Sequence, residues 1–328
     1  MPPLTLKAYS HSLPLEKPFR ISRGVRTTAN MVVAEISDGT HTGRGECMPY
    51  PRYDETIESV LELLENVAKN EENFATLEAC QNALPAGAAR NALDCARLDF
   101  EAKQSGVSVA DRFKLTMKPQ VTAFTLGIDT PSAMYEAAKA ANDRQVLKIK
   151  LGAGEEDIER LNAVRRGSPS AKLIVDANEG WKPEDFDHHL KSCIENNVGL
   201  IEQPLPAGDD DALLSIKSPI PICADESLHT REELDHIEKR YDAINIKLDK
   251  TGGLSEAMVV LAEAEKRGLI IMVGCMLSSS LSMAPAVYVA QRATWVDLDG
   301  PLLLASDCDH ALIYEDSTIL PPTPQLWG

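Results

Sequence analysis

Eight short apolar runs, rich in β-branched residues, recur along the chain at intervals of 22 to 27 residues. They begin at residues 121, 146, 173, 199, 221, 243, 270 and 295. Several intervening segments have the apolar spacing of amphipathic helices, namely residues 131–143, 155–167 and 254–268. Apolar strands that alternate with helices indicate a parallel sheet. Eight such units predict an α/β fold with a (β/α)8-type barrel, in the form (β/α)7β, and leave an open doubly wound sheet as the alternative.

The first part of the chain does not follow this repeat. Residues 7–15 and 31–46 alternate like antiparallel strands with a turn at Asp38-Gly39, and residues 57–70 and 85–106 are helix-like. We therefore expect three regions. They are an α+β capping domain over residues 1–117, a barrel catalytic domain over 118–304, and a C-terminal segment, 305–328, that returns to the capping domain.

Charge and cysteine content limit the class of protein. The formal net charge is −17 and the isoelectric point is about 4.9, which argues against a nucleic-acid or anionic-membrane partner. The seven cysteines show no CxxC spacing, as expected for reduced thiols. The sequence also contains no signal-peptide pattern and no apolar run of about 18 residues. We expect a cytoplasmic globular protein.

Three carboxylates follow consecutive strands of the predicted barrel. Asp176 lies in DANEGW, Glu202 in IEQPLP and Asp225 in ADES. The carboxyl ends of barrel strands carry the functional residues, so these side chains would converge and repel one another unless a cation lay between them. An oxygen-only set favours Mg²⁺ over zinc. The alternative is that each is a helix cap or a surface charge.

Three lysines flank this predicted metal site. Lys148 and Lys150 share one face of their strand, and Lys247 lies four strands further on, opposite Lys150. A nearby cation and partial desolvation lower the pKa of a lysine, which suits a general base. We predict Lys150 and Lys247 as an acid/base pair, with Lys148 tuning Lys150 and contacting a substrate carboxylate. The alternative is a lysine that only pairs with a metal-binding carboxylate.

Two opposed bases around one metal suit racemisation or epimerisation next to a carboxylate. Mg²⁺ bound to that carboxylate stabilises the enediolate formed when the α-proton leaves. One lysine removes the proton and the other returns a proton to the opposite face. This chemistry requires no organic cofactor.

Charged residues elsewhere suggest the substrate. Asp297 and Asp299, in DLDGP, form a carboxylate pair that needs a cation if buried, and the α-ammonium of a dipeptide supplies one. An N-acylated amino acid does not. The segment FRISRGVRT brings Arg20, Arg23 and Arg26, one of which can pair bidentately with a glutamate side chain. The alternatives are loop caps or a second metal for the aspartates, and solvated surface residues for the arginines.

Other residues next to these positions have predicted supporting roles. Cys275 and Met276 end a strand and are expected to line the substrate site, Cys275 as a packed thiol. Lys250 lies beyond its strand and is expected to serve the loop. Four polar residues are expected to orient the site: Asn178, Gln203, Glu226 and Asn245.

The KxK, DAN, EQP, ADES and NIKL motifs together resemble the muconate-lactonising subgroup of the enolase superfamily, and within it the dipeptide epimerases. The similarity extends over nearly the whole chain and includes these segments: PYPRY at 49–53, LPAGAARNALDCA at 84–96, IKLDKTGGL at 246–254, GCMLSSS at 274–280 and DLDGP at 297–301. It implies Mg²⁺-dependent epimerisation of dipeptides such as L-Ala-D/L-Glu in murein peptide recycling, with Mn²⁺ as a tolerated ion. Relatives of this kind often form homo-oligomers.

The resemblance also implies roles for individual residues. It makes Lys150 and Lys247 the acid/base pair and Asp176, Glu202 and Asp225 the metal ligands. It places the active site between the barrel mouth and two capping loops, near residues 23–27 and 47–53. For the glutamate side chain it favours Arg26, followed by Thr27, with Arg23 as the second choice.

Other functions remain open at this point. Within the same superfamily these are an N-acyl amino acid racemase, acting for example on N-acetyl or N-succinyl glutamate, and an o-succinylbenzoate synthase. Outside it, a Schiff-base lysine aldolase also uses a buried barrel lysine, but needs no three-carboxylate metal site. A non-catalytic scaffold would be expected to lack at least one member of the lysine and carboxylate set.

Overall fold

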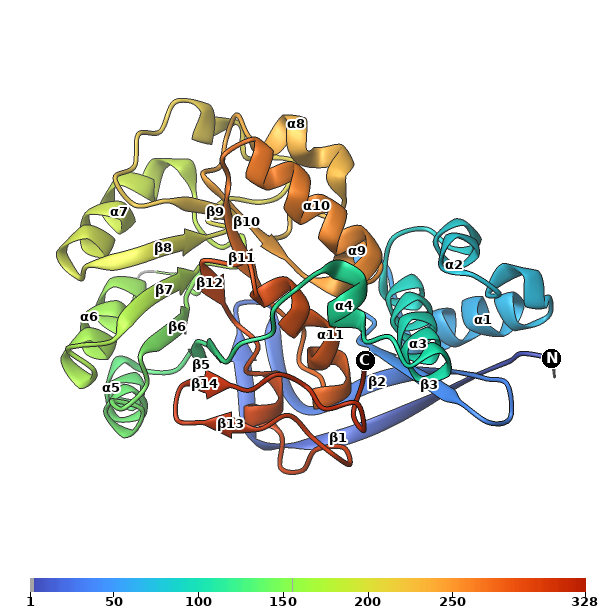
Figure 1. Ribbon diagram of the computed structural model, residues 1–328. Coiled ribbons are helices and arrows are strands. Elements are labelled where there is room, and N and C mark those ends of the chain that lie inside the picture. Colours follow the sequence, from blue (N-terminus) through green and yellow to red (C-terminus); the bar gives the residue numbers. More distant parts are fainter. Residues whose placement is uncertain (1–2, 155) are drawn as a thin grey trace.

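The computed structural model describes residues 3–154 and 156–328, and its centre is a barrel of parallel strands (Figure 1). Each strand pairs with the next along the chain, and the amide of Ala123 donates to the Val296 carbonyl at 2.8 Å, which joins the first strand to the last. All eight apolar runs form strands, so the predicted fold is confirmed. They are β5 (Phe124–Leu126), β6 (Val146–Lys150), β7 (Lys172–Asp176), β8 (Val198–Glu202), β9 (Ile222–Ala224), β10 (Ala243–Ile246), β11 (Ile270–Val273) and β12 (Trp295–Val296).

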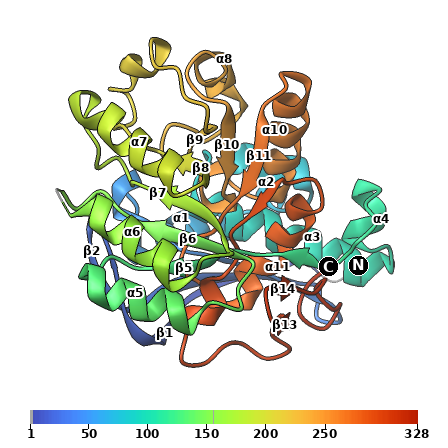
Figure 2. The ribbon, with the colours of Figure 1, turned by 90° about the vertical axis from the view of Figure 1, so that its left-hand side faces the viewer.

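Helices cover the outer face of the strands, as Figures 1 and 2 show for α5 to α7. The helix α5 begins where Thr130 caps it and Pro131 occupies its first turn. Only the 3₁₀ helix η4 (Asp211–Leu214) lies between β8 and β9, where the repeat is short. No helix within the described residues has both the length and the apolar character to cross a membrane. The barrel helices are α5 (Pro131–Ala140), α6 (Asp157–Gly167), α7 (Phe186–Glu195), α8 (Leu234–Ile237), α9 (Leu248–Thr251), α10 (Leu254–Lys266) and α11 (Ser280–Ala290).

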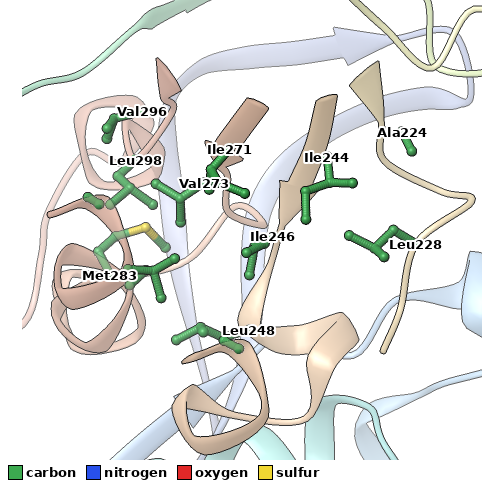
Figure 3. Close-up of a cluster of buried hydrophobic side chains, with 14 of the residues drawn as sticks. Ala224, Leu228, Ile244, Ile246, Leu248, Ile271, Val273, Met283, Val296 and Leu298 are labelled. Atoms are coloured by element: carbon green, nitrogen blue, oxygen red, sulfur yellow. The ribbon is translucent and has the colours of Figure 1, made fainter. Parts of the chain in front are cut away.

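Strand alternation divides the core into an inner and an outer layer. On β10, Ile244 and Ile246 face outward and pack with residues such as Met283 of α11 (Figure 3). The alternate residues of the same strand, Ala243 and Asn245, therefore face the barrel interior. The bottom of that interior is filled by one small or apolar residue from each of seven strands or strand starts: Ala123, Val146, Ile174, Leu200, Cys223, Ala243 and Met272.

The capping region is built on a long antiparallel hairpin, β1 (Thr5–Ile21) and β2 (Gly24–Ser37), followed by β3 (Thr42–Cys47). These strands are longer than the sequence alternation indicates. The hairpin extends beneath the molecule from the helical part of the cap to the barrel (Figure 1), and its tip at Ser22–Arg23 reaches the barrel loops. The helices of this region are α1 (Ile57–Ala68), α2 (Leu77–Ala83), α3 (Ala88–Ser105) and α4 (Val109–Phe113).

The C-terminal segment contacts two parts of the molecule. Its strands β13 (Tyr314–Glu315) and β14 (Thr318–Ile319) pair with β4 (Gln120–Val121), directly before the first barrel strand. Trp327 is then buried, and its indole N–H donates to the Cys95 carbonyl of α3 at 3.1 Å. The return to the capping region was expected from the sequence, but the pairing at the base of the barrel was not. The division at residues 117 and 304 remains a proposal.

We predict that Gly45→Ala destabilises the protein, because β3 lies directly on α3. A Cβ at this position would lie 2.2 Å from the Ala92 carbonyl oxygen and 2.6 Å from the Ala96 amide nitrogen, both backbone atoms. The helix would have to move, which typically costs about 1–3 kcal/mol of unfolding free energy. Urea unfolding followed by circular dichroism measures this. The control Thr42→Ala, exposed on the same strand, should change stability by less than about 0.5 kcal/mol, and equal effects would contradict the packing.

Candidate active site

A cavity of about 90 Å³ lies between the capping region and the mouth of the barrel. Both parts of the molecule supply its walls, as expected for a site between the barrel mouth and the capping loops. The capping side chains are Phe19, Ile21, Arg23, Arg26, Met48, Tyr50 and Tyr53, and the barrel side chains are Lys150, Asn178, Asp225, Glu226, Lys247, Cys275, Met276 and Leu277.

Strand register brings the predicted carboxylates together. Lys150 pairs with Asp176 across β6 and β7, and Asp176 pairs with Glu202 across β7 and β8. Asp225 follows β9, and its backbone amide donates to the side-chain oxygen of Gln203 at 2.8 Å. The three carboxylates are at most 1% exposed, so their charges need partners inside the protein.

Lys148 is the common partner of the buried acids. Its Nζ lies 2.7 Å from Asp297, 2.8 Å from Glu202 and 3.1 Å from Asp176. Burial acts to lower the pKa of Lys148, but the carboxylates outweigh it and hold that pKa well above its usual value. Lys148 does not line the cavity, and its contact with a substrate carboxylate stays a prediction. It shares the Asp176 Oδ2 atom with Lys150, so the two lysines are neighbours through this acid.

Lys150 and Lys247 both open onto the cavity. The Nζ of Lys150 lies 2.5 Å from Asp176, and that of Lys247 lies 2.7 Å from Asp225. Burial acts to lower the pKa of Lys247, but Asp225 outweighs it and the pKa is raised well above its usual value. The prediction from the sequence concerned a lysine beside a bound cation, whereas here the neighbouring carboxylate compensates the ammonium group directly.

The sequence interpretation missed Lys250. This lysine is fully buried, with its Nζ 2.6 Å from the second carboxylate oxygen of Asp225 and 3.1 Å from the Asn245 carbonyl. It faces inward because α9 begins directly after Lys247 and turns the chain back. Lys247 and Lys250 are three residues apart, which is about one helical turn, and this spacing was the signal available in the sequence. Asp225 is therefore held by one lysine on each oxygen.

The carboxylates fit a hard divalent cation by their chemistry. Over residues 3–154 and 156–328, no three histidine, cysteine, aspartate or glutamate side chains form a group that could hold a metal ion as they stand, and lysines pair with these carboxylates instead. Glu202 Oε2 forms an ion pair with Lys148 but accepts no hydrogen bond from the described residues. Buried carboxylate oxygens with unmet bonding capacity are the ligands that Mg²⁺ prefers.

Two asparagines hold the carboxylates in place. Asn245 donates from Nδ2 to Glu202 at 2.8 Å, and the backbone amide of Asn178 donates to Asp176 at 2.9 Å. Asn178 adopts a positive φ of 44°, which a non-glycine residue rarely does. Both asparagines were predicted to orient the site, and the structure places them in contact with it.

Arg23 closes the tip of the capping hairpin onto the barrel loops. It forms ion pairs with Glu226 at 2.7 Å and with Glu179 at 3.2 Å, and it donates to the Asn178 carbonyl at 3.3 Å. Arg52 also pairs with Glu179, at 2.9 Å. The charge of Arg23 is therefore already compensated, and so is that of Glu226, which was predicted to orient the site.

Arg26 differs from Arg23 because its guanidinium pairs with no carboxylate among the described residues. It lies over the Tyr50 ring, 5.1 Å from the centroid, and 3.7 Å from the Met48 sulfur. Burial lowers the pKa of Arg26. Strand alternation turns the next residue, Thr27, to the opposite, exposed face, so the structure does not bring Thr27 to the cavity.

Asp297 and Asp299 are buried close to Cys275, which lines the cavity. Asp297 already pairs with Lys148, whereas Asp299 accepts a hydrogen bond from the Thr125 amide at 2.6 Å. Burial, and then the charge of Asp297, raise the pKa of Asp299 to about 7. Burial together with these two acids raises the pKa of the Cys275 thiol. This thiol is packed rather than reactive.

Fold and site together define a capped barrel protein with two lysines and three acids at the barrel mouth, and comparisons with known proteins identify its family. Residues 4–113 match the mandelate racemase/muconate lactonizing enzyme N-terminal domain, and residues 133–324 match the enolase C-terminal domain-like family. The chain therefore belongs to the enolase superfamily.

Individual relatives are similar over almost their full length. An N-acetyl-D-glutamate racemase from Pseudoalteromonas sp. is 45% identical, over 91% of this chain and 95% of the relative. The L-Ala-D/L-Glu epimerase of Escherichia coli is 43% identical, over 94% and 97%. A solved enolase family member from Agrobacterium tumefaciens, with bound sodium and L-Ala-L-Glu, superposes with a TM-score of 0.97 at 49% identity, over 99% and 100% of the two chains.

A further solved relative contains magnesium. A dipeptide epimerase from Cytophaga hutchinsonii, complexed with Mg and D-Ala-L-Val, superposes with a TM-score of 0.91 at 26% identity. The match covers 97% of this chain and 93% of that one.

We predict that Asp249→Asn makes the protein less sensitive to pH. Asp249 is buried beside the site and accepts hydrogen bonds from the Met48 amide at 3.1 Å and from Asn91 at 2.8 Å. Burial raises its pKa to about 7, so the folded chain keeps a proton that the unfolded chain releases near pH 4. This stabilising contribution is complete below pH 4 and is lost as the pH rises through about 7.

The variant keeps both hydrogen bonds but cannot ionise. Its free energy of unfolding, measured by urea titration, should therefore rise relative to the unchanged protein between pH 5 and pH 8, by roughly 2–4 kcal/mol. The control Asp143→Asn, at an exposed position, should show no such trend. Parallel pH curves for Asp249→Asn and the unchanged protein would mean that Asp249 ionises normally.

Proposed function

We propose that this protein is a Mg²⁺-dependent isomerase that inverts the glutamate α-carbon of dipeptides such as L-Ala-D/L-Glu, with Lys150 and Lys247 as the acid/base pair. The observation that carries the proposal is that two lysines, from strands β6 and β10 four positions apart in the barrel, open onto one cavity beside Asp225. The relative from Escherichia coli and the dipeptide-bound structure from Agrobacterium tumefaciens support the choice of substrate.

Asp176, Glu202 and Asp225 would hold the Mg²⁺, which when bound stabilises negative charge on a coordinated substrate carboxylate. In the structure, Asp176 and Asp225 stabilise the ammonium forms of the two lysines. With Asp225 engaged by a cation, Lys247 would lose the partner that raises its pKa, which suits a general base. Lys150 would likewise lose its contact with Asp176. One lysine then accepts the α-proton, and the other donates a proton to the opposite face.

The walls of the cavity suggest how the rest of the substrate is bound. Arg26 offers a half-buried guanidinium with no anionic partner in the described chain, which suits the glutamate side-chain carboxylate. At the other side, Asp299 has no cationic partner in the same part of the chain and can accept the α-ammonium of the first residue. Asp297 contributes less, because Lys148 already compensates it.

N-acetylglutamate racemisation is the second candidate, and two observations favour it. The racemase from Pseudoalteromonas sp. is as similar to this chain as the epimerase is. Lys148 also neutralises Asp297, and the pKa of Asp299 is raised to about 7. The protein can therefore carry this pair without a substrate ammonium. Both substrates present the same two glutamate carboxylates, so Arg26 and the lysines would serve either one.

The proposal includes a cytoplasmic location and a role in murein peptide metabolism, because L-Ala-D-Glu is the proposed substrate. Support for the location comes from the seven cysteines, all of which are free thiols. Use of Mn²⁺ in place of Mg²⁺ and independence from organic cofactors belong to the same proposal.

We expect the protein, given Mg²⁺ in D₂O, to exchange the glutamate α-proton of L-Ala-L-Glu and to form the L,D diastereomer, as followed by NMR. N-acetyl-L-glutamate runs in parallel. Lys150→Met and Lys247→Met should each reduce epimerisation by about 10²-fold or more, yet each should still exchange the proton of one epimer. Lys172→Met, at an exposed position on β7, is the matched control and should leave the rate unchanged.

The outcomes separate the candidates. Exchange with N-acetyl-L-glutamate alone would reject the dipeptide and establish the second candidate. Exchange with neither substrate would reject both. Single lysine variants that lose exchange with both epimers equally would contradict the opposed arrangement of the two bases.

We predict that Arg26→Ala impairs the use of glutamate specifically. Loss of a charged hydrogen-bonding pair should lower kcat/KM for L-Ala-L-Glu by about 10- to 100-fold. L-Ala-L-Leu, which lacks the second carboxylate, should be affected much less. Arg20→Ala removes an exposed arginine from the same hairpin and should have little effect on either substrate. An equal loss with both dipeptides would show that Arg26 does not bind the glutamate side chain.

A further inference from the structure

A buried acid outside the cavity and outside every motif controls a set of hydrogen bonds next to the site. Asp210, 1% exposed, lies in the loop after β8. Its Oδ2 accepts hydrogen bonds from the Tyr241 hydroxyl at 2.6 Å and from the Ser227 hydroxyl at 2.9 Å. A carboxylate can only accept, so both hydroxyl hydrogens must point toward Asp210.

This arrangement favours one orientation of the Gln203 amide, which a hydrogen bond from its Nε2 to the Leu205 carbonyl at 2.8 Å favours as well. With their hydrogens turned away, Tyr241 and Ser227 present lone pairs to Gln203 Nε2, which lies 2.9 Å from each oxygen. The Gln203 Oε1 consequently faces two backbone amides, those of Asp225 at 2.8 Å and Ser227 at 3.1 Å. If the amide were reversed, its NH₂ group would oppose two other donors.

Gln203 connects two proposed metal ligands. It directly follows Glu202 at the end of β8, and its side chain holds the amide of Asp225 at the end of β9, the adjacent strand. Its backbone is strained, with a φ of 34°. The Gln203 side chain therefore adds a second link between the ends of β8 and β9, beyond the backbone hydrogen bond from the Gln203 amide to the Cys223 carbonyl at 2.8 Å.

The outer side of Asp210 is also compensated. Arg240 lies 3.4 Å and His236 3.3 Å from the other carboxylate oxygen, Oδ1, which offsets the cost of burying the charge. Burial and the hydrogen bond to Asp210 raise the pKa of Tyr241, so its phenol remains a donor at neutral pH. Both ends of the network are thus satisfied.

We propose that Asp210 is a positioning residue which, through Tyr241, Ser227 and Gln203, fixes the spacing of Glu202 and Asp225 and so determines the affinity of the site for Mg²⁺. The proposal rests on the metal site of the proposed function. Residues that orient metal ligands in this way commonly contribute about 10- to 100-fold to metal affinity.

The test is calorimetric titration of the full chain with Mg²⁺ alone, without substrate. Asp210→Ala should weaken Mg²⁺ binding by about tenfold or more. Tyr241→Phe should weaken it less, because the Ser227 link remains. Asp210→Asn should restore most of the affinity, because its side-chain oxygen still accepts from both hydroxyls. Asp209→Asn, at the exposed neighbouring position, is the matched control and should bind as the unchanged protein does.

Circular dichroism and thermal unfolding without Mg²⁺ accompany each titration. A purely structural role would lower the unfolding temperature and leave the Mg²⁺ affinity of the folded variant unchanged, and that result would overturn the proposal. If Asp210→Ala does not fold, Tyr241→Phe decides the question by the same criterion. Absence of Mg²⁺ binding by the unchanged protein would instead reject the metal site of the proposed function.

Discussion

Mutual compensation of buried charge at the barrel mouth is the interaction on which the rest of the structure depends. Acids and lysines from neighbouring strands are almost completely removed from water, and none would be tolerated there alone. Asp225 shows the principle most clearly, because Lys247 holds one oxygen and Lys250 the other. The parallel register places the acids of three consecutive strands between the lysines of β6 and β10, so the same geometry that satisfies the fold also gathers the reactive groups.

The capping region completes the site from the other side. The hairpin tip is attached by Arg23 to acids on two barrel loops, and Arg26, three residues further along, is left without an acid in the described chain. Arg23 therefore attaches the hairpin to the barrel loops, whereas Arg26 makes no such contact with the described residues. This division of labour between chemically identical side chains depends on which loops each one meets, and it explains why the sequence did not decide between them.

The parts of the molecule that can be predicted are those determined by the local periodicity of apolar residues. The eight strands follow from apolar runs at regular intervals, and Asp176, Glu202 and Lys150 follow from strand ends. Lys250 was missed because its direction depends on a short helix after the strand, and Thr27 was misplaced because its face depends on the hairpin register. Asp210 carries no sequence signal at all, since its partners come from three separate loops and strand ends.

The contact between the first and last barrel strands joins residues that are far apart in the sequence. Ala123 finds its partner at Val296, and Trp327 reaches back to α3 of the cap. Contacts between such distant residues form slowly because long loops must close first. The acids and lysines of the early strands are therefore enclosed only when the last strand and the tail are in place. Closure of the barrel and attachment of the tail to the cap both depend on the end of the chain.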